Sequence, residues 1–176
     1  MKNRITAYEI ALSGVAATMA TIFLSVGALS SALLFTGYLL AGLSLCLPLV
    51  KGGYIGYACA YVSCCLLTLL FCGFAFFFRL LPFIVFFGLH PLFNELQVRK
   101  RINGVVAFIV KSLWFCGAML LVFWLLFDMT TGIAFLDTYF IPILFILGPG
   151  VFFLYDKMYF LCRQQVDKVL KRIFKK

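Results

Sequence analysis

Long apolar segments of the chain contain ionisable residues, among them Glu9, Lys111 and Asp156. A charge in the hydrocarbon core of a membrane is costly unless it is paired or hydrated, so such residues are functional candidates. We expect all three to lie within a few turns of the inner face. A Lys111–Asp156 pair would join the fifth apolar segment to the sixth, and a Lys111–Glu9 pair would join it to the first. The alternative is a lysine that extends to the interface.

A second group of polar residues is predicted at the opposite, outer face. Arg79 stands beside an aromatic run, and Asp128, Asp137 and Tyr139 lie in or next to the longest outward loop. One guanidinium, two carboxylates and aromatic walls could form an outward-facing substrate pocket. The alternative is an arginine at the level of the lipid headgroups beside a solvated loop.

Sequence motifs for other chemistry are absent. His90 has no second His or Cys at ligand spacing, so no metal site is predicted. The seven cysteines form no CxxC pair and are interpreted as packing residues. The sequence contains no GxxxxGK[ST], HExxH or GxSxG motif. We therefore expect a protein that is not an enzyme and holds no cofactor.

The composition indicates an integral membrane protein. Of the 176 residues, 65% are hydrophobic and only 12% are charged, whereas soluble domains have about 25% charged residues. The apolar runs are longer than the roughly ten-residue strands of a membrane barrel, so helices are predicted. The net charge of +9 arises from basic residues between and after these runs, as the positive-inside rule requires.

The apolar runs predict an all-α protein of about six transmembrane helices in one compact bundle. We expect a kink or a stop at Pro48 and a break in the last helix at Gly148-Pro149-Gly150. The predicted spans cover residues 8–29, 32–50, 54–72, 76–96, 104–127 and 139–162.

The distribution of basic residues predicts the orientation and the division of the chain. With the N-terminus inside, almost all Lys and Arg residues outside the spans fall on the inner side, so both termini are predicted to be cytoplasmic. Residues 1–162 would form the transmembrane bundle. Residues 163–176 would form a basic, amphipathic cytoplasmic tail on the anionic inner leaflet.

The first span is unusually rich in small residues. Several pairs stand four residues apart, including Ala7 with Ala11 and Ala16 with Ala20. In lipid, small residues at this spacing allow two helix backbones to approach closely. Because these residues occupy much of its circumference, the first helix is expected to meet other helices on more than one side.

Together these features resemble the substrate-binding S components of energy-coupling factor (ECF) transporters. The resemblance rests on a basic N-terminus, a first span with Ala-x-x-x-Ala spacing, about six spans in under 200 residues and a basic tail. The second half is closer still to small membrane proteins of Gram-positive bacteria with that fold. The stretches that carry this likeness are FFGLHPLFNELQVRKRINGVVAFIVKSLWF (86–115) and FFLYDKMYFL (152–161).

The resemblance implies a multi-pass subunit of a bacterial importer. In that family the small face of the first span docks on a transmembrane coupling protein, the T protein, which works with two cytoplasmic ATPases. Ala16 and Ala20, or Ala7 and Ala11, match the docking motif. The substrate, a vitamin or another micronutrient, would bind in the outward pocket. The metal-binding branch needs N-terminal histidines, which this sequence lacks.

The same fold also implies a second function. Some proteins of this fold bind no small molecule and accompany cell-shape or wall-synthesis machinery. On that alternative, this chain is a scaffold or accessory membrane protein whose small-residue faces bind other membrane proteins.

Overall fold

The computed structural model describes residues 7–49, 52–126 and 134–173, and all regular structure in these residues is helical. Six helical stretches are long and apolar enough to cross a membrane, which confirms the predicted number of spans. Their composition is that of a multi-pass membrane protein. They are Ala7–Leu29, Ser31–Leu49, Tyr54–Cys72, Phe74–Arg99, Gly104–Leu125 and Tyr139–Val166.

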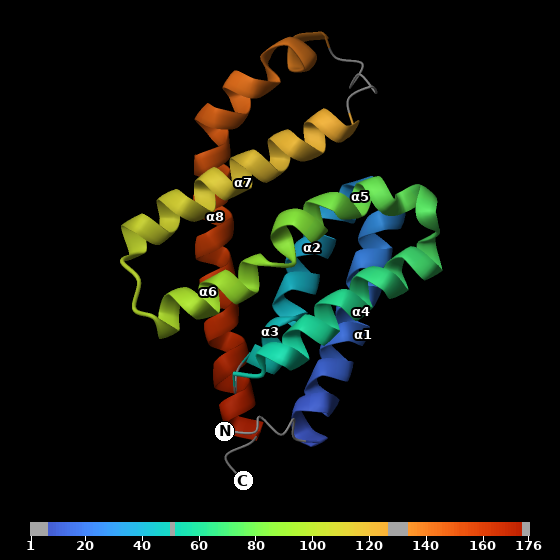
Figure 1. Cartoon of the computed structure of the whole chain (residues 1–176), viewed down its shortest axis with the longest axis vertical. Coiled ribbons are helices and arrows are strands. Elements are labelled where there is room, and N and C mark those ends of the chain that lie inside the picture. The colour runs from blue at the N-terminus through green and yellow to red at the C-terminus, as the bar shows by residue number, and fades with distance from the viewer. Residues whose placement is uncertain (1–6, 50–51, 127–133, 174–176) are drawn as a thin grey trace.

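Helix α1 (Ala7–Leu29) packs against both α2 (Leu34–Ser44) and α4 (Tyr54–Cys72) (Figure 1). Glycines allow the closest approach of α1 to α2. A Cβ placed on Gly37 would lie 2.7 Å from the carbonyl oxygen of Phe23 and 3.1 Å from the Cα of Gly27. Because the residues at this crossing are small, α1 and α2 contact each other through their backbones and not through side chains, as expected for helices in lipid.

The second and fourth spans are each divided. In the second span, Leu45 separates α2 from the short α3 (Cys46–Leu49). The helix is therefore interrupted before Pro48, and α3 ends one residue after it. The fourth span has four parts in sequence. These are a 3₁₀ turn, α5, a π-helical turn and α6, at Phe74–Phe76, Phe77–Pro82, Phe83–Phe87 and His90–Arg99.

The last two helices, α7 (Gly104–Leu126) and α8 (Ala134–Ile173), contact each other. Helix α8 runs without interruption through Gly148-Pro149-Gly150, so the predicted break is wrong. In a membrane, backbone groups released from a helix find no water, and Pro and Gly are accordingly tolerated within transmembrane helices. Helix α8 also continues past residue 162 to Ile173, so the described part of the predicted tail extends the last span.

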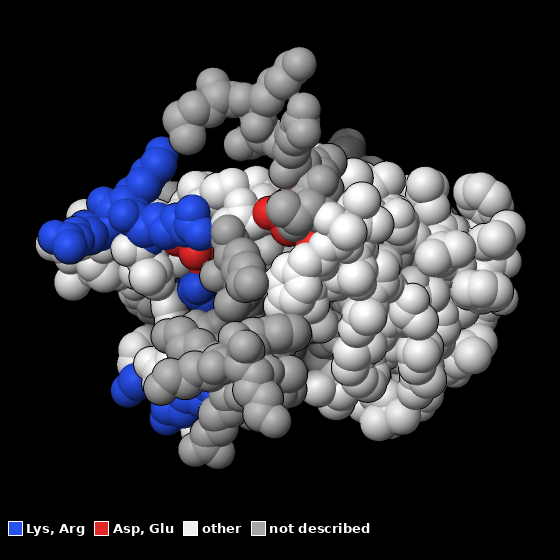
Figure 2. All heavy atoms as spheres, turned by 90° about the horizontal axis from the view of Figure 1, so that it is seen from below, with Lys and Arg blue, Asp and Glu red and all other residues white. Residues whose placement is uncertain are grey.

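Helix α1 begins and α8 ends at the same end of the molecule (Figure 1). Seen from that end, Lys and Arg side chains gather on one side, while the white surface on the other side carries none (Figure 2). The basic loop between α6 and α7 contributes the exposed residues Lys100 and Arg101. Both residues belong to the set that the sequence predicts on the inner side.

An aromatic core connects the two halves of the chain. Phe86 is fully buried, and its ring lies 4.8 Å from Trp114, 5.1 Å from Phe115 and 5.8 Å from Phe152, measured between ring centroids. Such edge-on contacts add about 0.5–1.5 kcal/mol each beyond the area that they bury. This core fixes the junction of the π-helical turn with α7 and α8.

Candidate functional site

Four polar side chains meet inside the bundle and join α6, α7 and α8. We call His90, Asn94, Lys111 and Asp156 the polar cluster. Asp156 Oδ1 lies 2.8 Å from Lys111 Nζ and 2.9 Å from His90 Nε2. The pair between Lys111 and Asp156 was one of two that the sequence predicted, and the structure pairs Lys111 with Asp156 instead of Glu9.

The hydrogen bonds of the polar cluster close into a ring. Lys111 Nζ also donates to Asn94 Oδ1 at 2.8 Å, and Asn94 Nδ2 lies 3.3 Å from His90 Nδ1. If His90 carries its proton on Nε2 and donates it to Asp156, its Nδ1 accepts from Asn94, and each of the four side chains makes two hydrogen bonds within the ring. The positive charge of the Lys111 ammonium then balances the negative charge of the Asp156 carboxylate, so no uncompensated charge is buried.

Burial makes this ring energetically important. His90 and Asn94 are fully buried, and Lys111 is only 4% exposed. Asp156 is the most accessible member, with 15% of its side chain exposed. Because unpaired polar groups in such surroundings are costly, the ring strongly favours one relative placement of the three helices.

A second layer of ion pairs joins α6 to α8. Glu95, whose side chain is 6% exposed, accepts from Arg99 Nε at 2.9 Å through Oε1 and from Arg163 through Oε2. Asn94 and Glu95 are not among the site residues predicted from the sequence. The sequence signal for this role is the spacing of four between His90 and Asn94 and between Glu95 and Arg99, which places each pair on one helix face.

Aromatic rings surround the imidazole of the polar cluster. The centroid of the His90 ring lies 4.9 Å from Tyr155, 5.1 Å from Tyr159 and 5.5 Å from Phe86. Lys111 Nζ stands 5.3 Å from the centre of the Phe160 ring, which is cation–π distance. The cluster therefore holds helices in place, and each of its polar groups has a partner within the described residues.

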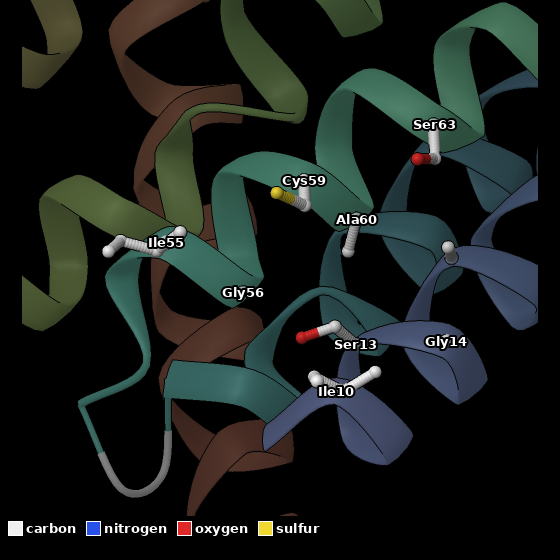
Figure 3. A pocket seen from close by; sticks show the side chains of 9 residues that line it. Ile10, Ser13, Gly14, Ile55, Gly56, Cys59, Ala60 and Ser63 are labelled. Atoms are coloured by element: carbon white, nitrogen blue, oxygen red, sulfur yellow. The ribbon is translucent and has the colours of Figure 1, made fainter. Parts of the chain in front are cut away.

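A groove of about 300 Å³ opens between α1 and α4 (Figure 3). Its floor is narrow because Ser13 faces Gly56, where a Cβ would collide with Ser13 Oγ. Gly14 lies at its open side, and a Cβ there would meet nothing within 4 Å. The groove is lined by Ile10, Ser13, Gly14, Ala17, Ile55, Gly56, Cys59, Ala60 and Ser63.

The four predicted docking residues fall on different sides of α1. Ala16 and Ala20 are fully buried within the chain. Ala7 and Ala11 are exposed on the first turns of the same helix. A surface that another protein could reach therefore includes Ala7, Ala11 and Gly14, while Ala16 and Ala20 take part in packing within the bundle.

The predicted outer pocket is described only in part. Arg79 Nη1 donates to the carbonyl oxygen of Ala28 at 2.8 Å, and the hydroxyl of Tyr38 donates to the carbonyl oxygen of Arg79. Arg79 thus caps the carboxyl end of α1, where a cation is favourable. Tyr139 is exposed on α8. Asp128 lies outside the described residues, and of Asp137 only the backbone, in α8, is described.

No protein-family model, no curated protein and no solved structure matches this chain. Two features of the described residues remain on which a function can rest. These are the polar cluster, which fixes α6, α7 and α8, and the groove between α1 and α4, which is open to the surface.

Proposed function

We propose that this chain is the substrate-binding subunit of an ECF-type importer in a bacterial cell membrane. The groove between α1 and α4 would dock on a transmembrane helix of the coupling protein. The observation that carries the proposal is the open side of this groove, where Gly14 presents bare backbone to the surface. The choice of a coupling protein as the partner is supported by the resemblance of the sequence to S components.

The groove suits a helix as its occupant. It is about 300 Å³ in volume and is lined mainly by small and aliphatic side chains. In lipid there is little hydrophobic drive to join helices, so association depends on close packing and weak polar contacts. Gly14 permits that close approach, and the nearby Ser13 and Ser63 supply hydroxyl groups.

The remaining parts of the importer proposal come from the sequence. The chain lacks a phosphate-binding loop motif, so two cytoplasmic ATPases would supply the energy of transport. The substrate, vitamin-like or another small micronutrient, would bind towards the outer face. Its proposed contacts are Arg79, Asp128, Asp137 and Tyr139.

The docking surface is tested with two matched glycine substitutions. Gly14→Leu fills the groove, whereas Gly117→Leu places the same side chain on exposed α7, where a Cβ also meets nothing within 4 Å. Tagged full-length chains are recovered in mild detergent from cells that express the protein natively, and copurified proteins are identified by mass spectrometry. We expect the wild type and Gly117→Leu to retain a coupling protein and two ATPases, and Gly14→Leu to lose them.

Retention of these partners by Gly14→Leu would contradict docking in this groove. The transport role itself is tested separately, by mass spectrometry of small molecules released when the purified wild-type chain is denatured. A stoichiometric micronutrient supports the importer, and repeated recovery of none contradicts it.

One observation favours the scaffold as a second candidate. The Arg79 guanidinium, the predicted cationic contact of the substrate, is hydrogen-bonded to the backbone of α1. That bond assigns the residue a structural role at this position. Recovery of cell-shape or wall-synthesis proteins in place of ATPases, lost with Gly14→Leu, would support a scaffold or accessory protein.

A further inference from the structure

A second groove, on the opposite half of the molecule, lies between the start of α7 and the middle of α8. Its volume is about 420 Å³, and it is open to the surface. Asp156 of the polar cluster forms part of its wall, and Gln97 at the end of α6 forms another part. The groove therefore borders the polar cluster that joins α6, α7 and α8.

The two ends of this groove differ in chemistry. Gly104, the first residue of α7, and Lys157 of α8 both line it. Because the fifth span begins at Gly104, Lys157 stands near the level at which α7 enters the membrane. Phe108 and Phe153 line the part that lies one turn further into each span. The groove thus has a charged end at the interface and an aromatic end towards the hydrocarbon.

The charge at the interfacial end is positive. The Asp156 carboxylate is balanced by Lys111 at 2.8 Å, and Glu95 is balanced by two arginines. Lys157 forms no ion pair within the described residues; its Nζ lies 5.1 Å from the centre of the Phe153 ring. Lys100 and Arg101 are exposed in the loop that leads into α7 and are likewise unpaired there.

Lys100 and Arg101 are held near the groove because they lie only a few residues along the chain from Gly104, which lines it. Arg101 precedes Gly104 by three residues, so their Cα atoms lie within about 11 Å of each other. Juxtamembrane cations attract anionic lipid headgroups by about 1 kcal/mol each. A headgroup with a negative phosphate and an attached acyl chain therefore matches the groove in both charge and polarity.

We propose that the groove between α7 and α8 binds one anionic phospholipid. Its phosphate would lie at Lys157, within reach of Lys100 and Arg101, and an acyl chain would lie along Phe108 and Phe153. The site is independent of the importer and scaffold proposals, because it uses neither α1 nor α4. Bound lipid would cover the side of the polar cluster on which Asp156 is partly exposed.

The charge contribution is tested by native mass spectrometry of the full-length chain in neutral detergent. Phosphatidylglycerol and phosphatidylcholine with the same acyl chains are titrated separately. We expect one phosphatidylglycerol to bind in preference, and Lys157→Gln to weaken that binding about five-fold. Lys168→Gln, which removes an exposed cation of α8 outside the groove, should leave the affinity unchanged.

A filled groove gives a second test. Gly104→Leu adds a side chain where a Cβ meets nothing within 4 Å, so it should abolish the preferred lipid without disturbing the fold. Gly117→Leu, equally free of contacts, should retain the lipid.

Three results would overturn the proposal. One is equal binding of the two lipids, and another is equal loss of affinity in Lys157→Gln and Lys168→Gln. The third is a dimer that Gly104→Leu dissociates, which would assign the groove to a second copy of the chain.

Discussion

At the scale of single residues, the closed ring of the polar cluster gives each member a defined task. Asp156 accepts from two donors, and Lys111 supplies two of its three protons to oxygen atoms on different helices. Because each member has two partners, removal of Lys111 leaves Asp156 in contact with His90 but without the ammonium that balances its charge in a water-poor interior. Removing the charge from both sides of the ion pair leaves no uncompensated charge, which is the larger of the two costs.

This difference gives a prediction for Lys111. Lys111→Met should lower the free energy of unfolding by about 3–5 kcal/mol, because it leaves the Asp156 carboxylate without its counter-ion. The double variant Lys111→Met with Asp156→Asn should recover a large part of that loss. Unfolding is followed by circular dichroism during titration of mixed micelles with a denaturing detergent.

The control for this prediction is Lys157→Met, which removes an exposed lysine from α8. Its loss should be below about 1 kcal/mol, as for exposed charges in general. If Lys111→Met costs no more than Lys157→Met, the ion pair does not stabilise the bundle.

The sequence predicted the residues of the ion pair but only half of the cluster. Lys111 and Asp156 are recognisable because any charge in an apolar run needs a partner. His90 and Asn94 are polar but uncharged, and their role depends on the face that α6 turns towards α7. That face is set by the preceding π-helical turn, which no periodicity in the aromatic run of the fourth span indicates.

At the scale of helices, the helices in the first half of the chain pack mainly by close approach of their backbones. The crossing of α1 and α2 places Gly27 and Gly37 in direct contact. The small residues of α1 are divided between the inside of the chain and its surface. Those buried within the chain include Ser13, Ala16, Ala17, Ala20 and Gly27, and those exposed are Ala7, Ala11, Gly14 and Thr18.

The substitution Gly37→Ala, which adds a single methyl group, tests this crossing. In Gly37→Ala the new Cβ would lie 2.7 Å from the carbonyl oxygen of Phe23, a backbone atom that cannot move without its helix. We expect a loss of about 1–3 kcal/mol, typical of overpacking, in the same unfolding assay. Gly117→Ala meets nothing within 4 Å and should be neutral or slightly stabilising; equal effects of the two would argue against a tight crossing.

The predicted ends of most spans agree with the described helices to within a few residues, because apolar length and turn residues define them. Tyr54–Cys72 was predicted with these bounds. The error at Gly148-Pro149-Gly150 has a physical origin. Pro and Gly end helices in water, where released backbone groups are hydrated, but a membrane interior offers no such alternative.

At the scale of the whole molecule, the end where α1 begins and α8 ends carries Lys and Arg side chains, gathered on one side of the view from that end (Figure 2). The number of spans is even, as a common side for both ends requires. From the distribution of Lys and Arg along the sequence, we predict that this end faces the cytoplasm. Arg79 lies away from these basic residues, at the carboxyl end of α1, which it caps.

This orientation predicts the accessibility of two loops. A short epitope inserted after Gly73 should be labelled by antibody in intact cells, because this turn lies opposite the basic end. The same epitope after Asn103, beside Lys100 and Arg101, should be labelled only after permeabilisation. The reverse pattern would show that the basic end faces outward.

The π-helical turn at Phe83–Phe87 determines how α6 is rotated about the helix axis relative to α5. The amide of Gly88 donates to the carbonyl oxygen of Phe83, five residues earlier, at 2.7 Å, so this turn holds one residue more than an α-helical turn. Each residue advances a helix by about 100°. The surplus residue thus acts as an angular offset between the two halves of the span: without it, the imidazole and amide of α6 would be rotated away from the ammonium and carboxylate that they meet.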